Sequence, residues 1–171
     1  WNEADFSYEI WTATLRKSFI ESNGPEGISL YIHLPFCESL CTFCGCNKRI
    51  TKNHSVENPY IEAVLKEWSI YCNILGEKPT IKEIHLGGGT PTFFSPKNLE
   101  DLINGIFTHA KKALDHEFSF EGHPNNTSHE HLKKLYDLGF RRVSFGVQDY
   151  SAKVQKAIHR EQPFHNVAKV T

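Results

Sequence analysis

Short apolar runs alternate with longer helical patterns along the 171-residue chain. Four runs rich in β-branched and aromatic residues predict strands, since each ends in glycine, proline or a polar turn. These strands are expected over residues 28–34, 81–86, 117–121 and 142–147. Apolar residues at helical spacing predict helices over 59–75, 96–114 and 128–138. Strands separated by helices cannot be joined by hairpins, so we expect an α/β fold with parallel strands.

The residues that carry chemistry follow the predicted strands. Cysteines follow the first strand, a glycine run the second, Glu121 closes the third and Gln148 follows the fourth. The carboxyl ends of strands are where α/β barrels build their sites. Four β/α units predict either an open sheet or a partial (β/α) barrel truncated after about the fourth unit, because four strands cannot close a barrel. We expect residues 1–27 to form an N-terminal extension and residues 28–171 to form the first part of the barrel.

The two ends of the sequence favour a longer native protein. The chain begins at Trp1 and contains no methionine, so we expect a lost N-terminal segment. Since the fourth strand would otherwise be left as a bare edge, we expect the native protein to continue beyond Thr171.

Composition narrows the class of protein. Apolar residues make up 39% of the chain, enough to bury one core of ordinary size. The net charge of −1 gives no field that would attract nucleic acid or an anionic membrane. Neither a long apolar span nor a secretory signal is present. We therefore expect a soluble, cytoplasmic protein that binds neither nucleic acid nor membranes, and that is a monomer.

Three cysteines form the strongest motif. Cys37, Cys41 and Cys44 are spaced C-x3-C-x2-C, so one short loop can aim all three thiols at one site. Soft thiolates suit an iron–sulfur cluster or zinc. A 4Fe-4S cluster needs four ligands, so three cysteines leave one iron open for a cofactor. Cys46 could instead complete a closed zinc or ferredoxin-like site, although the C-x-C span reaches one metal awkwardly. Cys72 lies in an apolar helical stretch, where core packing is the usual role.

A glycine run is the second motif. Gly87-Gly88-Gly89-Thr90-Pro91-Thr92 follows a predicted strand and precedes a helix. Its backbone could approach a ligand closely and offer N–H groups to a carboxylate or phosphate. A tight strand-to-helix turn would explain the same residues. The run is neither G-x-G-x-x-G nor a P-loop, so a nucleotide phosphate is not the favoured ligand.

Together, the two motifs resemble those of the radical S-adenosylmethionine (SAM) superfamily, over nearly the whole chain. The resemblance implies a partial barrel of the radical SAM type. It also implies that Cys37, Cys41 and Cys44 bind a 4Fe-4S cluster whose fourth iron chelates SAM. An electron from the reduced cluster would then cleave SAM to a 5'-deoxyadenosyl radical.

Finer motifs are similar to those of the oxygen-independent coproporphyrinogen III oxidase family. They are Tyr31-Ile-His33-Leu-Pro35-Phe36-Cys37, Cys44-Gly45-Cys46-Asn47-Lys48, Phe145-Gly146-Val147-Gln148-Asp149 and His159-Arg160-Glu161-Gln162. This implies an oxidoreductase of haem biosynthesis that decarboxylates coproporphyrinogen III to protoporphyrinogen IX, with a tetrapyrrole substrate and an electron donor as partners. A radical SAM haem chaperone, which binds and transfers haem, and a radical enzyme acting on another substrate stay open as alternatives.

The resemblance assigns cofactor contacts to single residues. Tyr31, Gly87 and Glu121 match contacts to a first SAM, against which Phe43 would pack. A second SAM is implied by Gly88, Gly89, Gln148 and Arg160. Judged alone, a strand tyrosine is usually core, a glutamate at a strand end is usually solvated and an arginine usually lies on the surface.

Substrate contacts are less defined. By charge alone, Lys48, Arg49, Arg141 and Arg142 could meet the substrate carboxylates. His33 points toward the cysteine loop, as a proton handler or as a core histidine.

Overall fold

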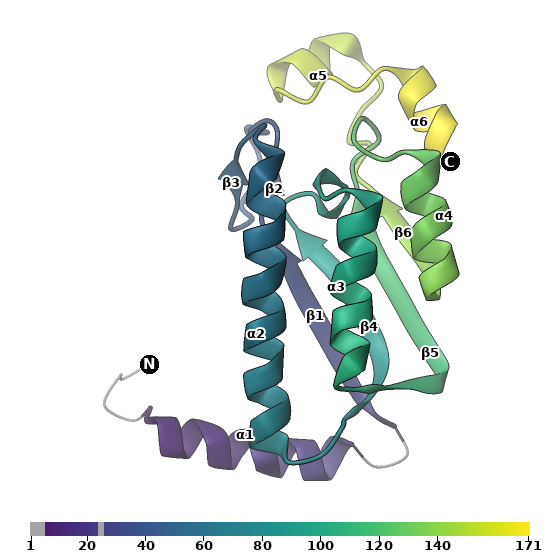
Figure 1. The fold of residues 1–171 in the computed structure, drawn as a ribbon. Helices are drawn as coiled ribbons and strands as arrows, with labels where there is room; N and C mark the ends of the chain where they lie inside the picture. Colours follow the sequence, from purple (N-terminus) through teal and green to yellow (C-terminus); the bar gives the residue numbers. More distant parts are fainter. Residues whose placement is uncertain (1–5, 24–25) are drawn as a thin grey trace.

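The computed structural model describes residues 6–23 and 26–171, so residues 1–5 and 24–25 of the predicted extension lie outside it. Within the extension, helix α1 (Tyr8–Ser22) was not predicted. Ser7 caps its start by accepting a hydrogen bond from the N–H of Ile10 at 3.2 Å. Arg16 Nε donates to the carbonyl of Ile74 at 2.9 Å, which fastens α1 across one end of helix α2 (Glu57–Leu75; Figure 1).

A parallel sheet of four strands confirms the predicted α/β class. Its order is β1 (Ile28–Leu34), β4 (Thr80–Gly88), β5 (Lys111–Gly122) and β6 (Phe140–Phe145). Helices α2 (Glu57–Leu75), α3 (Pro96–Thr108) and α4 (His129–Leu138) cover one face of this sheet, as Figure 1 shows. The arrangement is that of a partial barrel.

Several predicted boundaries were wrong. The helix expected over 96–114 ends at Thr108, and the strand expected over 117–121 begins at Lys111. Residues 111 and 112 are paired with Thr80 and Ile81. Pairing with β4 therefore makes this segment a strand where a helix was predicted. Strand β6 ends at Phe145, two residues before the predicted end, and α2 begins two residues earlier than expected.

The helix-covered face holds the core. Ile81, Ile84 and Leu86 of β4 and Phe118 of β5 are fully buried, together with the apolar stripe of α3. That stripe consists of Leu99, Leu102, Ile103 and Ile106. Burial of these side chains is the main source of stability for the fold.

The opposite face of the same strands is polar and open. It carries Tyr31, His85 and Ser119, which occupy neighbouring positions in the register of β1, β4 and β5. His85 Nδ1 and the Ser119 hydroxyl are 2.8 Å apart, and the Tyr31 ring stacks on His85 with 5.8 Å between centroids. Polar side chains on this face therefore contact each other across the strands.

The carboxyl ends of the strands carry the remaining segments. The cysteine loop, defined here as residues 38–48, lies between the two-residue strands β2 (Phe36–Cys37) and β3 (Arg49–Ile50). Helices α5 (Ala152–Ala157) and α6 (Phe164–Val170) lie at the same end (Figure 1). No helix within the described residues is both long and apolar enough to cross a membrane.

Candidate active site

The base of the cysteine loop is closed by backbone hydrogen bonds. Thr51 N donates to the carbonyl of Cys37 at 2.9 Å, and Arg49 N donates to that of Pro35 at 2.8 Å. Within the loop, Lys48 Nζ donates to the carbonyls of Cys44 and Cys46 at 2.9 and 3.1 Å. Lys48 is therefore used to hold the loop, whereas charge alone suggested a substrate contact.

The three cysteines of the motif line one cavity of about 130 Å³. Gly89 and Thr90 of the glycine run and Arg160 line it too. Phe43 is also part of its wall, and half of its surface is exposed. Cys46 is exposed and is not among the described residues that line this cavity. The fold thus brings the C-x3-C-x2-C thiols together around one cavity, while Cys46 lies beside the Cys44 thiol without lining that cavity.

Two sulfur atoms have polar neighbours from distant segments. The Thr90 hydroxyl lies 3.3 Å from Cys37 Sγ, and an Arg160 guanidinium nitrogen donates to Cys41 Sγ at 3.5 Å. Burial is the largest influence on Cys37 and raises the pKa of its thiol, while Thr90 and Arg160 act in the lowering direction. Donors of this kind orient thiolates and stabilise their charge when a metal is bound.

The thiols do not converge on a single point. Among the described residues, no group of three or more His, Cys, Asp or Glu side chains is placed to hold one metal ion. An iron–sulfur cluster differs from zinc in this respect, because each thiolate binds its own iron. Three soft thiols around one cavity therefore fit a cluster.

The glycine run packs tightly against the end of β1. Gly88 has a φ of +115°, and a Cβ there would lie 2.8 Å from the His33 ring. A Cβ on Gly89 would lie 2.6 Å from the carbonyl oxygen of Pro35. The N–H groups of Gly89 and Thr90 donate to Leu34 and Phe36, so the expectation that these two serve a carboxylate or phosphate was wrong. The close contacts at Gly88 and Gly89 leave no room for a side chain, so both positions require glycine.

Residues at the end of the open face form a second cluster. Tyr31 OH lies 3.1 Å from His33 Nδ1, and a Cβ on Gly87 would lie 2.9 Å from the Tyr31 ring. Glu121 Oε1 is 3.6 Å from His85 Nε2. The pKa of Tyr31 is raised, first by desolvation and then by the charge of Glu121. Tyr31, Gly87 and Glu121 are thus neighbours, as a shared ligand would require.

Gln148 and Arg160 meet at Gly146. Arg160 donates two hydrogen bonds to the Gly146 carbonyl, at 2.7 and 3.1 Å. A Cβ on Gly146 would lie 2.9 Å from both Arg160 and Gln148 side-chain nitrogens. Gln148 has a φ of +65°, in the left-handed region that few residues other than glycine adopt. These contacts hold the Arg160 guanidinium between the end of β6 and the cysteine loop.

The other basic candidates lie apart from this cavity. Arg142 pairs with Glu117 at 3.3 Å on the open face, and Arg141 lies over the Tyr136 ring of α4 at 3.9 Å. Arg49 is exposed beside the base of the loop. Cys72 packs against the core, as its helical position suggested.

His123 lines the cavity and was missed by sequence reasoning. Its Nδ1 accepts a hydrogen bond from the N–H of Asn125 at 3.1 Å. Burial first, and then the charge of Arg160, lower the pKa of His123 to about 4. The imidazole is therefore neutral at pH 7, with its proton on Nε2. No spacing in the sequence singles out this residue.

The family is decided by a match over most of the chain. The profile described as "Radical SAM superfamily" matches residues 31–171. The chain belongs to the radical SAM superfamily. Membership in the radical SAM superfamily implies a 4Fe-4S cluster and SAM as cofactors. The resemblance noted for the cysteine and glycine motifs is thereby confirmed.

Similar proteins point to one branch of the radical SAM superfamily. The chain is 44% identical to oxygen-independent coproporphyrinogen III oxidase of Helicobacter pylori, over 95% of this chain and 36% of that protein. It is 39% identical to the protein of the same name from Pseudomonas aeruginosa, over 79% of this chain and 30% of that protein. The chain spans about a third of the length of these curated relatives.

A solved radical SAM structure has the same fold. Coproporphyrinogen III oxidase (HemN) of Escherichia coli, described as a radical SAM enzyme, superimposes with a TM-score of 0.84 and 31% identity. The match covers 95% of this chain and 36% of that one. The predicted partial barrel of the radical SAM type is thus confirmed.

Proposed function

We propose that the protein is an oxygen-independent coproporphyrinogen III oxidase, which oxidatively decarboxylates coproporphyrinogen III to protoporphyrinogen IX. One observation carries the proposal: Cys37, Cys41 and Cys44 line a single cavity with Arg160, in a chain whose relatives bear that name. The substrate is a tetrapyrrole, and a separate donor supplies electrons. Residues 28–171 form part of the radical SAM barrel, and residues 1–27 extend it at the N-terminus.

The cysteine loop is the proposed cluster site. Cys37, Cys41 and Cys44 each bind one iron, and the absence of Cys46 from the cavity wall supports an open fourth iron. When bound, the cluster supplies the electron that cleaves SAM. Thr90 and Arg160 donate to the thiolates of Cys37 and Cys41 and so fix their orientation.

The open face is the proposed place for a first SAM. Tyr31, Gly87 and Glu121 bind it, and Phe43 packs against it from the loop. Two observations support this placement of SAM. Tyr31 is in contact with Gly87, and the ion pair of Glu121 with His85 lies beside them. A strand-end carboxylate and a tyrosine hydroxyl can bind the amino and hydroxyl groups of SAM.

A second SAM is proposed beside Gly88, Gly89, Gln148 and Arg160. The contact of Gln148 and Arg160 with Gly146 supports a shared role. A guanidinium binds a carboxylate through two parallel hydrogen bonds, which suits the methionine end of SAM. The neutral His123 imidazole in the same cavity wall keeps a further N–H available.

The test is electron paramagnetic resonance of anaerobically reconstituted, reduced full-length protein, with and without SAM. We expect a 4Fe-4S signal that shifts when SAM is added. Replacing Cys41→Ser should remove the cluster, whereas Cys46→Ser should leave both the cluster and the shift in place. Loss of the metal in Cys46→Ser, or binding of zinc alone by the unaltered protein, would contradict the proposal.

A second assay separates the oxidase from a haem-transfer protein. Release of carbon dioxide from coproporphyrinogen III is expected with the full-length protein, SAM and a reductant. Transfer of haem without any decarboxylation would contradict the enzymatic assignment.

A further inference from the structure

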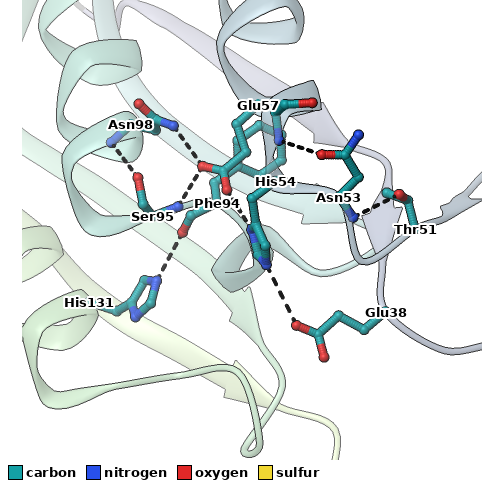
Figure 2. Close-up of polar contacts among 10 residues, drawn as sticks. Glu38, Thr51, Asn53, His54, Glu57, Phe94, Ser95, Asn98 and His131 are labelled. Atoms are coloured by element: carbon teal, nitrogen blue, oxygen red, sulfur yellow. Dashed lines mark hydrogen bonds and ion pairs between the residues drawn. The ribbon is translucent and has the colours of Figure 1, made fainter.

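A buried carboxylate lies behind the cysteine loop and joins segments that the cofactor site needs. Glu57, the first residue of α2, is 2% exposed. Its Oε2 accepts hydrogen bonds from Ser95 N at 2.8 Å and Asn98 Nδ2 at 2.7 Å, and its Oε1 lies 2.7 Å from His54 Nδ1 (Figure 2). The carboxylate thus ties the start of α2 to the start of α3.

The environment explains how Glu57 tolerates burial. Three hydrogen bonds replace the water that a carboxylate would otherwise bind. The amino-terminal ends of α2 and α3 both meet at this side chain, and their dipoles favour negative charge. Because Ser95 caps α3 and follows the glycine run by a few residues, Glu57 holds that turn directly.

His54 continues the connection to the cysteine loop. It lies in the short helical turn η2 (His54–Val56), at the exit of the loop. Its ring stacks on buried Phe93 with 4.4 Å between centroids and 14° between planes. With Nδ1 directed to Glu57, its Nε2 lies 3.9 Å from the carboxylate of Glu38, the residue after Cys37. Figure 2 shows the histidine between the two glutamates.

Both sides of the candidate site are therefore connected to one pair of residues. On one side is Glu38, beside the first cysteine of the motif; on the other are Phe93 and Ser95, which follow the glycine run. Phe94, between the latter two, is held from α4, since His131 Nε2 lies 2.9 Å from its carbonyl oxygen. Glu38 also lines the cavity of the three thiols, whereas Glu57 and His54 are not among the described residues that line it.

We propose that Glu57 and His54 are positioning residues, which fix the cysteine loop relative to the turn after the glycine run and so set how the cluster and SAM are bound. They act through Glu38, Phe93 and Ser95 and do not touch the cofactors. The inference rests on the proposed function in one respect, namely that a cluster is bound by Cys37, Cys41 and Cys44.

The experiment uses anaerobically reconstituted full-length protein and three readouts. These are the rate at which a chelator removes iron, the affinity for SAM from the shift of the resonance signal, and the thermal unfolding midpoint. His54→Leu is the main variant, because 54% of the His54 side chain is exposed, so the unfolding midpoint should fall less than for a change inside the core, although one hydrogen bond of Glu57 is lost. Glu57→Gln keeps the shape of the carboxylate and removes its charge.

We expect His54→Leu and Glu57→Gln to weaken SAM binding and speed iron loss by roughly tenfold, the lower end of the range for removing a group hydrogen-bonded directly to a metal ligand, because these two residues act through intermediate contacts. His54→Gln keeps a donor for Glu57 and should recover most of the loss. Glu100→Gln is the matched control. It removes a carboxylate of α3 that pairs with Lys134 of α4, and it should behave as the unaltered protein.

Iron loss and SAM affinity within twofold of the unaltered protein in both variants would overturn the inference, whatever the unfolding midpoint. If the unaltered protein holds a cluster that does not respond to SAM, the proposed function fails, and the chelator rates alone decide the role of Glu57 and His54. An unaltered protein that binds no cluster would overturn both.

Discussion

The two faces of the four-stranded sheet are made by the same strands and differ in almost every other respect. Toward the helices, neighbouring positions of β4 and β5 carry Ile84 and Phe118, which are fully buried. Toward the open face, the next positions carry His85 and Ser119, which are hydrogen-bonded to each other. Parallel strands covered by helices on both faces are apolar throughout. The alternation here means that one face stabilises the fold and the other is available for a ligand.

The strongest test of this contrast uses two adjacent residues of β4. Ile84→Ala should lower the free energy of unfolding by about 2–5 kcal/mol, because it leaves a cavity in a fully packed core. His85→Ala should cost less, about 1 kcal/mol, since its contacts with Ser119, Tyr31 and Glu121 are made by a side chain that is 40% exposed. Urea unfolding of the full-length protein measures both. Equal losses would show that the open face is also part of the core.

A response to acid is expected at the candidate site, and also at buried His131 of α4, whose pKa is lowered by burial. His123 has a pKa lowered from 6.5 to about 4 in the folded protein, so the unfolded chain binds its proton first. Stability is therefore full above pH 6.5 and falls as the pH drops toward 4, by about 3 kcal/mol for this residue. His123→Gln should show a correspondingly smaller fall in urea unfolding at pH 7 and pH 4. If the unaltered protein and His123→Gln lose the same free energy of unfolding between pH 7 and pH 4, His123 does not have a lowered pKa in the folded protein.

The smallest effect is expected from the ion pair on the open face. Arg142 and Glu117 are 3.3 Å apart and both largely exposed. Arg142→Ala should therefore change the free energy of unfolding by less than about 1 kcal/mol, and high salt should remove the difference. A loss as large as that for Ile84→Ala would mean that the open face is held together by its charges.

Helix starts were predicted correctly where the capping residues are adjacent in the sequence. Ser128 caps α4 within one residue of the predicted start, and Ser95-Pro96 begins α3 where expected. The prediction failed at Lys111–Leu114, because Ala113 and Leu114 continue an apolar helical pattern while their backbone belongs to β5. Pairing with β4 overrides the local preference there, and no sequence window contains that partner.

The candidate site divides in the same way. The cysteine spacing lies within one loop, so the shared cavity could be anticipated from the sequence alone. The roles of His123, His54 and Glu57 could not, since their partners come from other elements. Glu57, for example, binds residues about 40 positions away, at the start of α3. Glu57 connects the two helices only because the fold buries it beside α3, and the sequence around Glu57 does not indicate that burial.

The attachment of the cysteine loop to the end of the chain has a consequence for assembly. Thr42 N donates to the carbonyl of Ile158, and Arg160 reaches Cys41 across 119 positions of sequence. At ribosomal rates of 5–20 residues per second, the loop is made roughly 6 to 24 s before the segment that holds it. Iron insertion during that interval would meet thiols that lack these partners. The surroundings of the thiols are therefore complete only after residues 158–160 have been made and have reached the cysteine loop.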